Sequence, residues 1–202
     1  MKRILYTGLR SPDPTYIHCP LISIVPTPKA DLLPFFQAIP KASHILFTSQ
    51  TAVEIFFSYL DQPLPDVQFL AIGKKTASLL PAPARIAEEE TGEGVVSLLE
   101  TLQIPFLLYP HSALSRFLIT DYLQKKKIPH LATHLYTSVT RKVDPLPSLD
   151  EIDEIIFTSP STVLAFLEIF GEIPQNKKIS SIGPVTTDCL LALIGPNRTE
   201  CF

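Results

Sequence analysis

The chain has 202 residues, of which 46% are apolar and 18% are charged, and its formal net charge is −3. This composition is typical of a globular protein rather than a disordered one, and the slight negative charge argues against nucleic-acid binding. Its 20 prolines are about twice the usual share, whereas its seven glycines are about half, which leaves little glycine for phosphate-binding loops.

Short apolar runs alternate with amphipathic stretches from the first residues onward. Residues 3–8 and 21–25 predict strands, and residues 44–47 predict a buried strand that ends in Thr48-Ser49. The helix expected next has apolar residues at the helical spacing of three and four. Those residues are Val53, Phe56, Phe57 and Leu60.

The middle of the chain continues this alternation. Residues 67–72 predict a strand, and Gly73 and Thr76 then begin a helix expected to carry Leu79 and Leu80. Residues 106–109 predict another strand, whose helix ends at the basic run 125–127, as suits the negative end of a helix dipole. Residues 131–139 predict a further strand.

The last third repeats the earlier pattern at a constant offset of 110 residues. The segment HILFTSQTAV at 44–53 aligns with EIIFTSPSTV at 154–163, and AIGKKT at 71–76 aligns with SIGPVT at 181–186. Each copy is therefore two strand–helix units in series, which predicts two α/β domains with parallel, Rossmann-like sheets.

The strand at 3–8 resembles that at 106–109 and completes the second copy, so one domain is discontinuous. We expect an inserted domain at residues 26–132 and an outer α/β domain made of residues 1–21 plus 141–202. The linkers between them are then residues 22–25 and 133–140, a two-stranded connection. The outer copy is the shorter of the two, because it has no equivalent of the predicted helix at 95–102.

Several other classes of protein are excluded by incomplete motifs. Gly73-Lys74-Lys75-Thr76 is not the end of a P-loop, because Gln68 stands where the first glycine belongs. The apolar runs are far shorter than the roughly 20 residues that span a membrane, and no signal peptide is evident, so we expect a cytoplasmic protein without membrane contact. Three distant cysteines without a CxxC pair predict no disulfide framework.

The ordered motifs resemble those of the uroporphyrinogen-III synthase family. The resemblance rests on residues 45–49, 71–73 with Thr76, 135–137, 156–161 and 182–184 with Thr186, and it covers most of the chain. It implies two α/β domains, a single-chain enzyme that is generally monomeric, no cofactor, and an active site between the domains. It further implies a cyclising hydro-lyase of heme biosynthesis that converts hydroxymethylbilane to uroporphyrinogen III with inversion of ring D.

The resemblance also implies roles for individual residues. Tyr136 matches the family's linker tyrosine and is the candidate catalytic proton donor, although a tyrosine in an apolar strand by itself indicates core packing. Substrate carboxylates are expected at strand ends and helix starts, where backbone N–H groups are unpaired. The same Ser and Thr residues could simply be helix N-caps. The candidate substrate-binding residues are Thr48, Ser49, Gly73, Thr76, Thr158, Ser159, Gly183 and Thr186.

Weaker candidates and alternatives remain open at the level of sequence. Arg10, Lys74 and Arg116 lie near predicted strand ends or helix starts and could meet a carboxylate, whereas His130 and His134 lie on a predicted strand and make a poor zinc site. A non-enzymatic two-domain binder of a small anionic ligand would use the same helix starts. A response-regulator-like module would need an acidic cluster at a strand end, and none follows the predicted strands.

Overall fold

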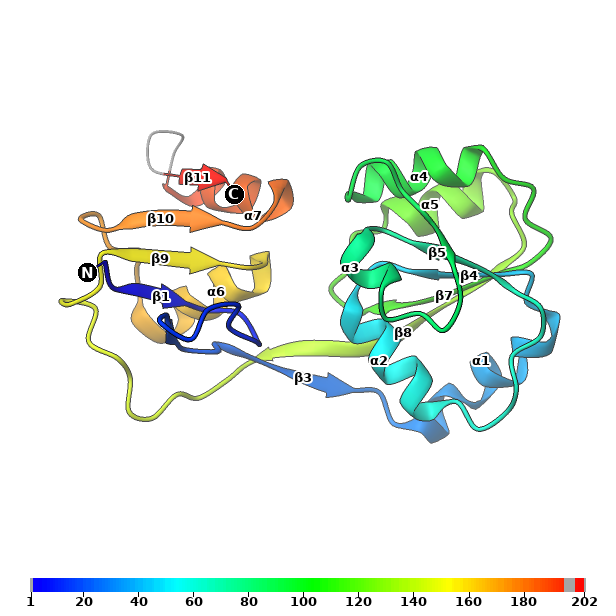
Figure 1. Ribbon diagram of the computed structural model, residues 1–202, viewed down its shortest axis with the longest axis horizontal. Coiled ribbons are helices and arrows are strands. Elements are labelled where there is room, and N and C mark those ends of the chain that lie inside the picture. The colour runs from blue at the N-terminus through cyan, green and yellow to red at the C-terminus, as the bar shows by residue number, and fades with distance from the viewer. Residues whose placement is uncertain (1, 195–198, 202) are drawn as a thin grey trace. The chain divides into compact units, whose positions relative to one another are not determined.

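The computed structural model describes residues 2–194 and 199–201 (Figure 1). The chain divides into two compact units: an outer unit, Met1–Ile24 with Ser138–Phe202, and a middle unit, Val25–Thr137. Within the described ranges, no helix is long and apolar enough to cross a membrane.

The middle unit is built on a six-stranded sheet in the order β3-β8-β7-β4-β5-β6. All the pairings from β8 to β6 are parallel. The strands are β3 (Ile22–Pro26), β4 (His44–Phe47), β5 (Gln68–Ala71), β6 (Ala84–Ile86), β7 (Leu107–Ser112) and β8 (His130–Thr140). Because the strands run parallel, their carboxyl ends gather at one edge of the sheet, which is where ligands bind in such folds.

Helices cover both faces of this sheet (Figure 1). On one face, α4 (Gly92–Glu100) and α5 (Leu118–Lys125) bury Val95, Leu99 and Leu123 against Leu46 and Tyr109. On the other, α1 (Leu33–Gln37) and α2 (Gln50–Tyr59) form an aromatic core with the sheet. Its rings include Phe35, Phe36, Phe47, Phe56 and Phe69. The remaining elements are η1 (Lys29–Leu32), η2 (Ile39–Lys41) and α3 (Lys74–Ala77).

The outer unit has a five-stranded parallel sheet in the order β11-β10-β9-β1-β2. Its strands are β1 (Ile4–Tyr6), β2 (Ile17–His18), β9 (Glu154–Phe157), β10 (Lys178–Ser181) and β11 (Thr199–Cys201). The helices α6 (Pro160–Phe170) and α7 (Pro184–Ile194) pack on it and contribute Val163, Phe166 and Leu190 to its core. Two parallel α/β sheets therefore confirm the predicted fold class.

The structure corrects one predicted helix and adds elements that were not predicted. The helix after Gly73 ends at Ala77 and does not carry Leu79 or Leu80, because Pro81 and Pro83 follow and a residue before proline avoids the helical conformation. The segment 26–43, for which no element was predicted, forms η1, α1 and η2. The outer unit also has a strand equivalent to β6, since β11 pairs with β10 as β6 pairs with β5.

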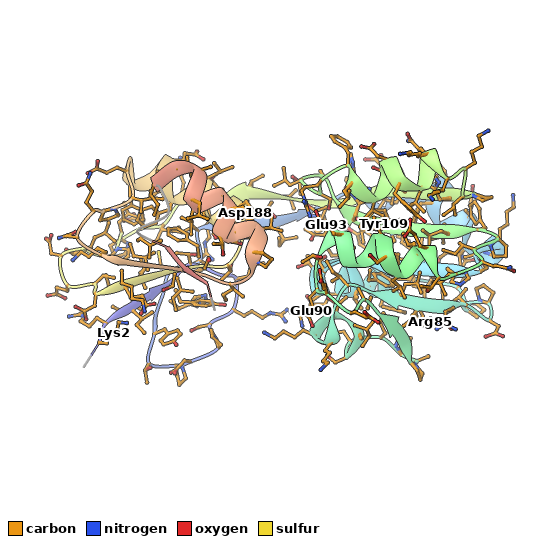
Figure 2. All side chains as sticks on the ribbon, turned by 90° about the horizontal axis from the view of Figure 1, so that it is seen from above. Lys2, Arg85, Glu90, Glu93, Tyr109 and Asp188 are labelled. Atoms are coloured by element: carbon orange, nitrogen blue, oxygen red, sulfur yellow. The ribbon has the colours of Figure 1, made fainter. Side chains whose placement is uncertain are left out.

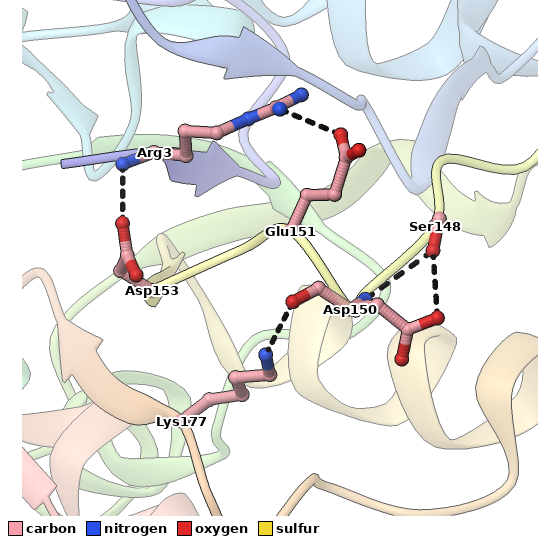
Figure 3. Close-up of polar contacts among 6 residues, drawn as sticks. All are labelled: Arg3, Ser148, Asp150, Glu151, Asp153 and Lys177. Carbon is pink, nitrogen blue, oxygen red and sulfur yellow. Dashed lines mark hydrogen bonds and ion pairs between the residues drawn. The ribbon is translucent and has the colours of Figure 1, made fainter. Parts of the chain in front are cut away.

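Charged side chains hold the amino edge of the outer sheet together (Figure 3). The Arg3 N–H donates to Asp153 Oδ2 at 2.7 Å, and the Arg3 guanidinium pairs with Glu151 at 2.6 Å. Next to them, the buried Glu154 carboxylate pairs with Lys2 and accepts a hydrogen bond from Ser180. The charged groups named here pair with one another within the unit, so we assign this edge of the sheet a structural role.

Candidate active site

The turn Thr48-Ser49 joins β4 to α2 at the carboxyl edge of the middle sheet. Ser49 is the N-cap of α2: its backbone is extended, and its Oγ accepts a hydrogen bond from the Ala52 N–H at 3.0 Å. The capping role considered from the sequence is therefore real. The same Oγ also lies 2.9 Å from the Tyr136 hydroxyl, which no sequence pattern indicated.

Tyr136 reaches this turn because β8 contains an irregularity. Up to His111 and His134, successive residues of β7 and β8 pair one to one, but Ser112 then pairs with Tyr136, so Leu135 is an extra residue in β8. A β-bulge changes the direction of the side chains that follow it and is common beside active sites. Here it places the phenol of Tyr136 among hydroxyl groups, with a hydrogen bond to Ser49 and with Ser112 and Thr51 nearby.

The environment of Tyr136 keeps its phenol protonated. The side chain is 7% exposed. Burial raises the pKa of Tyr136, and the hydrogen bonds from the neighbouring hydroxyl groups offset this only in part. A neutral phenol that is hydrogen-bonded to a serine can donate its proton to a group placed beside it. Tyr136 is thus chemically suited to general-acid work at neutral pH.

The second predicted turn of the middle unit begins at Gly73, the N-cap of α3. Its φ of −162° is ordinary extended backbone, so any residue could adopt it. A Cβ there would lie 2.3 Å from the Glu90 carboxyl carbon, so a larger residue would displace the end of the exposed Glu90 side chain. Glu90 accepts a hydrogen bond from the Lys74 N–H at 3.0 Å, so a carboxylate of the chain itself occupies this helix start. Glu90 is exposed, and its carboxylate still caps this helix start.

The two middle-unit turns are neighbours. The Gln50 side chain, at the start of α2, donates a hydrogen bond to the Lys75 carbonyl of α3 at 3.2 Å. Thr76 follows in α3 and its side chain is 5% exposed. The structure thus brings Thr48, Ser49, Gly73, Thr76 and Tyr136 to one edge of the sheet, with the Thr76 hydroxyl turned into the protein.

The equivalent turn of the outer unit, Thr158-Ser159, is closed by a capping box. The Thr162 hydroxyl accepts hydrogen bonds from the N–H groups of Thr158 and Ser159, both at 3.2 Å. In the middle unit the equivalent of Thr162 is Ala52, whose methyl group offers no acceptor to Thr48 and Ser49. The two copies of the repeat therefore differ. The N–H groups of the outer turn donate to the Thr162 hydroxyl, whereas the middle turn has no equivalent acceptor at position 52.

The last pair of predicted residues lies at the start of α7 in the outer unit. Gly183 has a φ of +87°, a left-handed conformation that favours glycine, and it meets no close neighbour. Thr186 is 2% exposed, so its hydroxyl, like that of Thr76, is buried. Of the two equivalent glycines, only Gly183 therefore has a backbone conformation that favours glycine, whereas Gly73 is in close contact with the Glu90 carboxylate.

The charged candidates are distributed unevenly. Arg116 follows β7 and makes a two-pronged ion pair with Glu93, at 2.8 and 2.9 Å. Arg10 is exposed in the loop after β1. His130 and His134 both lie on β8, as predicted, and within the described part of the chain no group of three His, Cys, Asp or Glu residues could hold a metal ion.

Sequence reasoning missed two buried polar rings at the same edge of the middle sheet. Tyr109 and His111 alternate along β7, and their rings stack with centroids 4.5 Å apart. Both lie in or just after residues 106–109, which the sequence predicts to be an ordinary apolar strand. The available signal was the alternation of aromatic residues at the predicted strand's end, with Tyr109 and His111 two residues apart.

The comparisons with known proteins agree with this geometry. The model of a protein family described as uroporphyrinogen-III synthase HemD matches residues 8–193. The chain belongs to the uroporphyrinogen-III synthase family. It is accordingly a cyclising lyase of heme biosynthesis, and the reading as a non-enzymatic binder finds no support. No curated protein sequence matches the chain at a significant level.

Solved structures of family members share the fold. The uroporphyrinogen-III synthetase of Helicobacter pylori 26695 is 23% identical, with a TM-score of 0.68 over 100% of this chain and 92% of that one. A mutant uroporphyrinogen III synthase of the extremely thermophilic bacterium Thermus thermophilus is 18% identical, with a TM-score of 0.66 over 99% of this chain and 92% of that one. The wild-type Thermus enzyme is 19% identical, covers 99% and 92% of the two chains, and has a TM-score of 0.56.

Proposed function

We propose that this chain cyclises hydroxymethylbilane to uroporphyrinogen III with Tyr136 as the proton donor. The proposal rests on the contact of the buried Tyr136 phenol with Ser49. Ser49 lies in the turn Thr48-Ser49 before α2, which we call the open turn because Ala52 offers its N–H groups no acceptor. This contact joins a proton donor to backbone N–H groups that suit an anion, as the reaction requires.

The first step is loss of the hydroxyl group from the hydroxymethyl carbon of ring A. The carbon–oxygen bond breaks, the oxygen takes the Tyr136 proton and departs as water, and a cationic methylene remains on ring A. Ser49 Oγ already accepts the Ala52 N–H, and its own proton can point to the Tyr136 oxygen. The phenol proton is then free for the leaving oxygen, and the phenolate is stabilised by the surrounding hydroxyl groups.

In the second step, the substituted carbon of ring D attacks this cationic carbon and forms a spiro intermediate. The bond from that ring D carbon to the bridge shared with ring C then breaks, and the bridge carbon bonds to the unsubstituted carbon of ring D, which leaves ring D inverted. Closure at the unsubstituted carbon of ring D, which occurs without the enzyme, gives isomer I. Selection of isomer III is therefore a matter of holding the bilane in one folded shape. The formerly unsubstituted carbon of ring D then loses its proton, so that ring D regains its pyrrole aromaticity, and the proton passes to the Tyr136 phenolate. The net change is loss of water.

Binding of the substrate requires local positive potential, because hydroxymethylbilane carries eight carboxylates and the chain has a net charge of −3. We assign this role to backbone N–H groups at the carboxyl edges of both sheets, near Thr48, Ser49, Gly73 and Thr76 in the middle unit and Thr158, Ser159, Gly183 and Thr186 in the outer unit. The open turn at Thr48-Ser49 is the strongest of these, since Thr162 and Glu90 already fill two of the others.

We further propose that the enzyme acts as a cytoplasmic monomer, without metal or organic cofactor and without a nucleic-acid partner. We also keep the sequence-derived division into a middle domain at 26–132 and an outer domain at 1–21 plus 141–202. The residues between, 22–25 and 133–140, would then form the two-stranded connection between the domains. The charge and the two-unit organisation support these assignments.

The direct test is to supply bilane freshly made by the preceding enzyme and to separate isomers I and III by chromatography. We expect isomer III to dominate and its share to rise with enzyme concentration, with no effect of a chelator. Product that stays isomer I at every enzyme concentration would refute the proposed function, and activity abolished by the chelator would refute only the absence of a metal.

A further inference from the structure

Tyr109 is a second buried tyrosine at the carboxyl edge of the middle sheet, and the mechanism above does not use it. It lies on β7 among the core residues under α4 and α5, is 1% exposed, and is labelled within the middle unit in Figure 2. Its hydroxyl lies 3.4 Å from Thr48 Oγ1, and the Ser115 side chain is near it. Both residues are in loops at this edge rather than in the core.

The two tyrosines contact consecutive residues of the same turn. Tyr109 on β7 faces Thr48, and Tyr136 on the neighbouring strand β8 faces Ser49. The turn before α2 is thus fixed by a pair of phenols. In the outer unit the equivalent turn is fixed differently, by the Thr162 hydroxyl, and Ala52 cannot supply that bond in the middle unit.

His111 restricts the Tyr109 ring. The two rings are nearly parallel, at 22°, and the edge of His134 meets His111 with centroids 5.0 Å apart. His111 is 6% exposed and its Nδ1 is 2.9 Å from the Ser112 carbonyl, so Nδ1 carries the proton and the imidazole has one orientation. The phenol of Tyr109 is therefore held in place from the side as well as at its hydroxyl.

A phenylalanine would fill the same core space without a hydroxyl group. Burial of a hydroxyl is unfavourable unless hydrogen bonds replace those lost to water, so the Tyr109 hydroxyl contributes only through its partners. The partner at hydrogen-bond distance is Thr48 in the turn, and Ser115 in the loop is near it. The Tyr109 hydroxyl therefore acts through its contact with the Thr48-Ser49 turn.

We propose that Tyr109 is a positioning residue that holds the Thr48-Ser49 turn, and with it the first N–H groups of α2, in the orientation that receives a substrate carboxylate. This inference rests on the proposed function for its consequence in catalysis. If Tyr109 positions the turn, loss of its hydroxyl should alter substrate binding more than folding. If Tyr109 only packs in the core, the loss should alter folding instead.

The test is Tyr109→Phe, with Tyr122→Phe on α5 as the matched control. Tyr122 is a partly buried tyrosine of the same unit, packed on the same core, whose ring lies under Lys126 rather than at the turn. In Tyr109→Phe we expect KM for the bilane to rise about fivefold, in the range of one net hydrogen bond, while kcat changes little. Tyr122→Phe should leave both constants at wild-type values.

A second measurement does not depend on the reaction. Without ligand, the amides of residues 48–52 should exchange with solvent several times faster in Tyr109→Phe than in wild type, and Thr48→Val should give the same acceleration. The double variant should be no faster than either single variant, because the two changes remove one interaction.

Wild-type KM and wild-type exchange at 48–52 in Tyr109→Phe would overturn the proposal. A general loss of stability, with faster exchange across the whole middle unit, would assign Tyr109 a packing role instead and would also overturn it. If the wild-type chain made no isomer III, the proposed function would fail, but the exchange measurement would still decide whether Tyr109 holds the turn.

Discussion

The proposed chemistry depends most on the phenol of Tyr136. Tyr136→Phe keeps the ring and its packing and removes the proton donor. We expect kcat to fall by about 100-fold or more, the usual contribution of a general acid, with a thermal midpoint close to that of wild type. A water molecule that takes the place of the hydroxyl would reduce the loss to about tenfold.

Steady-state kinetics with fresh bilane, alongside Tyr122→Phe, measure this effect. Because the pKa of Tyr136 is raised, the phenol stays protonated through neutral pH, and wild-type kcat should not fall between about pH 6 and 8 on its account. Wild-type turnover in Tyr136→Phe would show that Tyr136 only packs.

Glu154 is the residue that links folding of the outer unit to pH. Burial raises the pKa of its carboxyl, but hydrogen bonds from Lys2 and Ser180 and the charges of Lys2 and Lys178 outweigh this, so the pKa lies below the ordinary value of 4.5. A carboxyl group with a lowered pKa in the folded state stabilises the protein above its ordinary pKa, and this contribution is lost as the pH falls through the folded value.

Glu154→Gln should therefore destabilise the protein at neutral pH by about 1–2 kcal/mol, and the difference from wild type should shrink as the pH falls below 4.5. Urea unfolding at a series of pH values measures it. Asp121→Asn on α5 provides a carboxyl control away from this cluster. A difference that is constant with pH would contradict the assigned role of the charge.

At the scale of elements, a hydroxyl introduced at position 52 should weaken substrate binding at the start of α2. Ala52→Ser gives the middle turn the acceptor that Thr162 provides in the outer turn. The new hydroxyl should take the N–H groups of Thr48 and Ser49, lower their availability to a substrate carboxylate, and raise KM severalfold.

The thermal midpoint should rise or stay constant, which separates this effect from damage to the core around the buried Ala52. Ser97→Ala on α4 is a control at an exposed helical site. A lower KM in Ala52→Ser would show that the open turn is not where the carboxylate binds.

The end of α5 contains an unusual residue for its conformation. Lys127 has a φ of +55°, and the Ile128 N–H bonds back to the Leu123 carbonyl at 2.9 Å, as in a Schellman ending. Glycine is favoured here because a side chain costs about 1 kcal/mol in this region. Lys127→Gly should thus stabilise the middle unit by about that amount, seen as a higher urea midpoint, whereas Lys125→Gly within the helix should destabilise it.

The strands and the long helices were predictable because their signals are local. The FTS and IGxxT repeats mark strand ends before helices, and β4, β5, β9 and β10 with α2, α6 and α7 lie where the repeats indicate. The length of α3 was misjudged, because two prolines after Leu80 outweigh the apolar pair that suggested a longer helix.

The candidate site could be predicted only in outline. Ser49 and Ser159 are readable as residues at helix starts, but the contact between Ser49 and Tyr136 joins residues 87 apart in sequence and depends on the extra residue in β8. Tyr109 and Glu90 were missed for the same reason. Their partners, Thr48 in the turn after β4 and Lys74 at the start of α3, lie far from them in the sequence, and no local pattern indicates a pairing of that kind.

At the scale of the whole molecule, the account holds that the carboxyl edges of both sheets bind the tetrapyrrole. Hydrogen exchange with and without saturating uroporphyrinogen III tests this directly. We predict that amides of Ser49 and Thr76 in the middle unit and of Ser159 and Thr186 in the outer unit gain protection together, while amides of the outer unit's amino edge, such as Asp153, do not change. Protection confined to one unit, or none at either edge, would contradict the account.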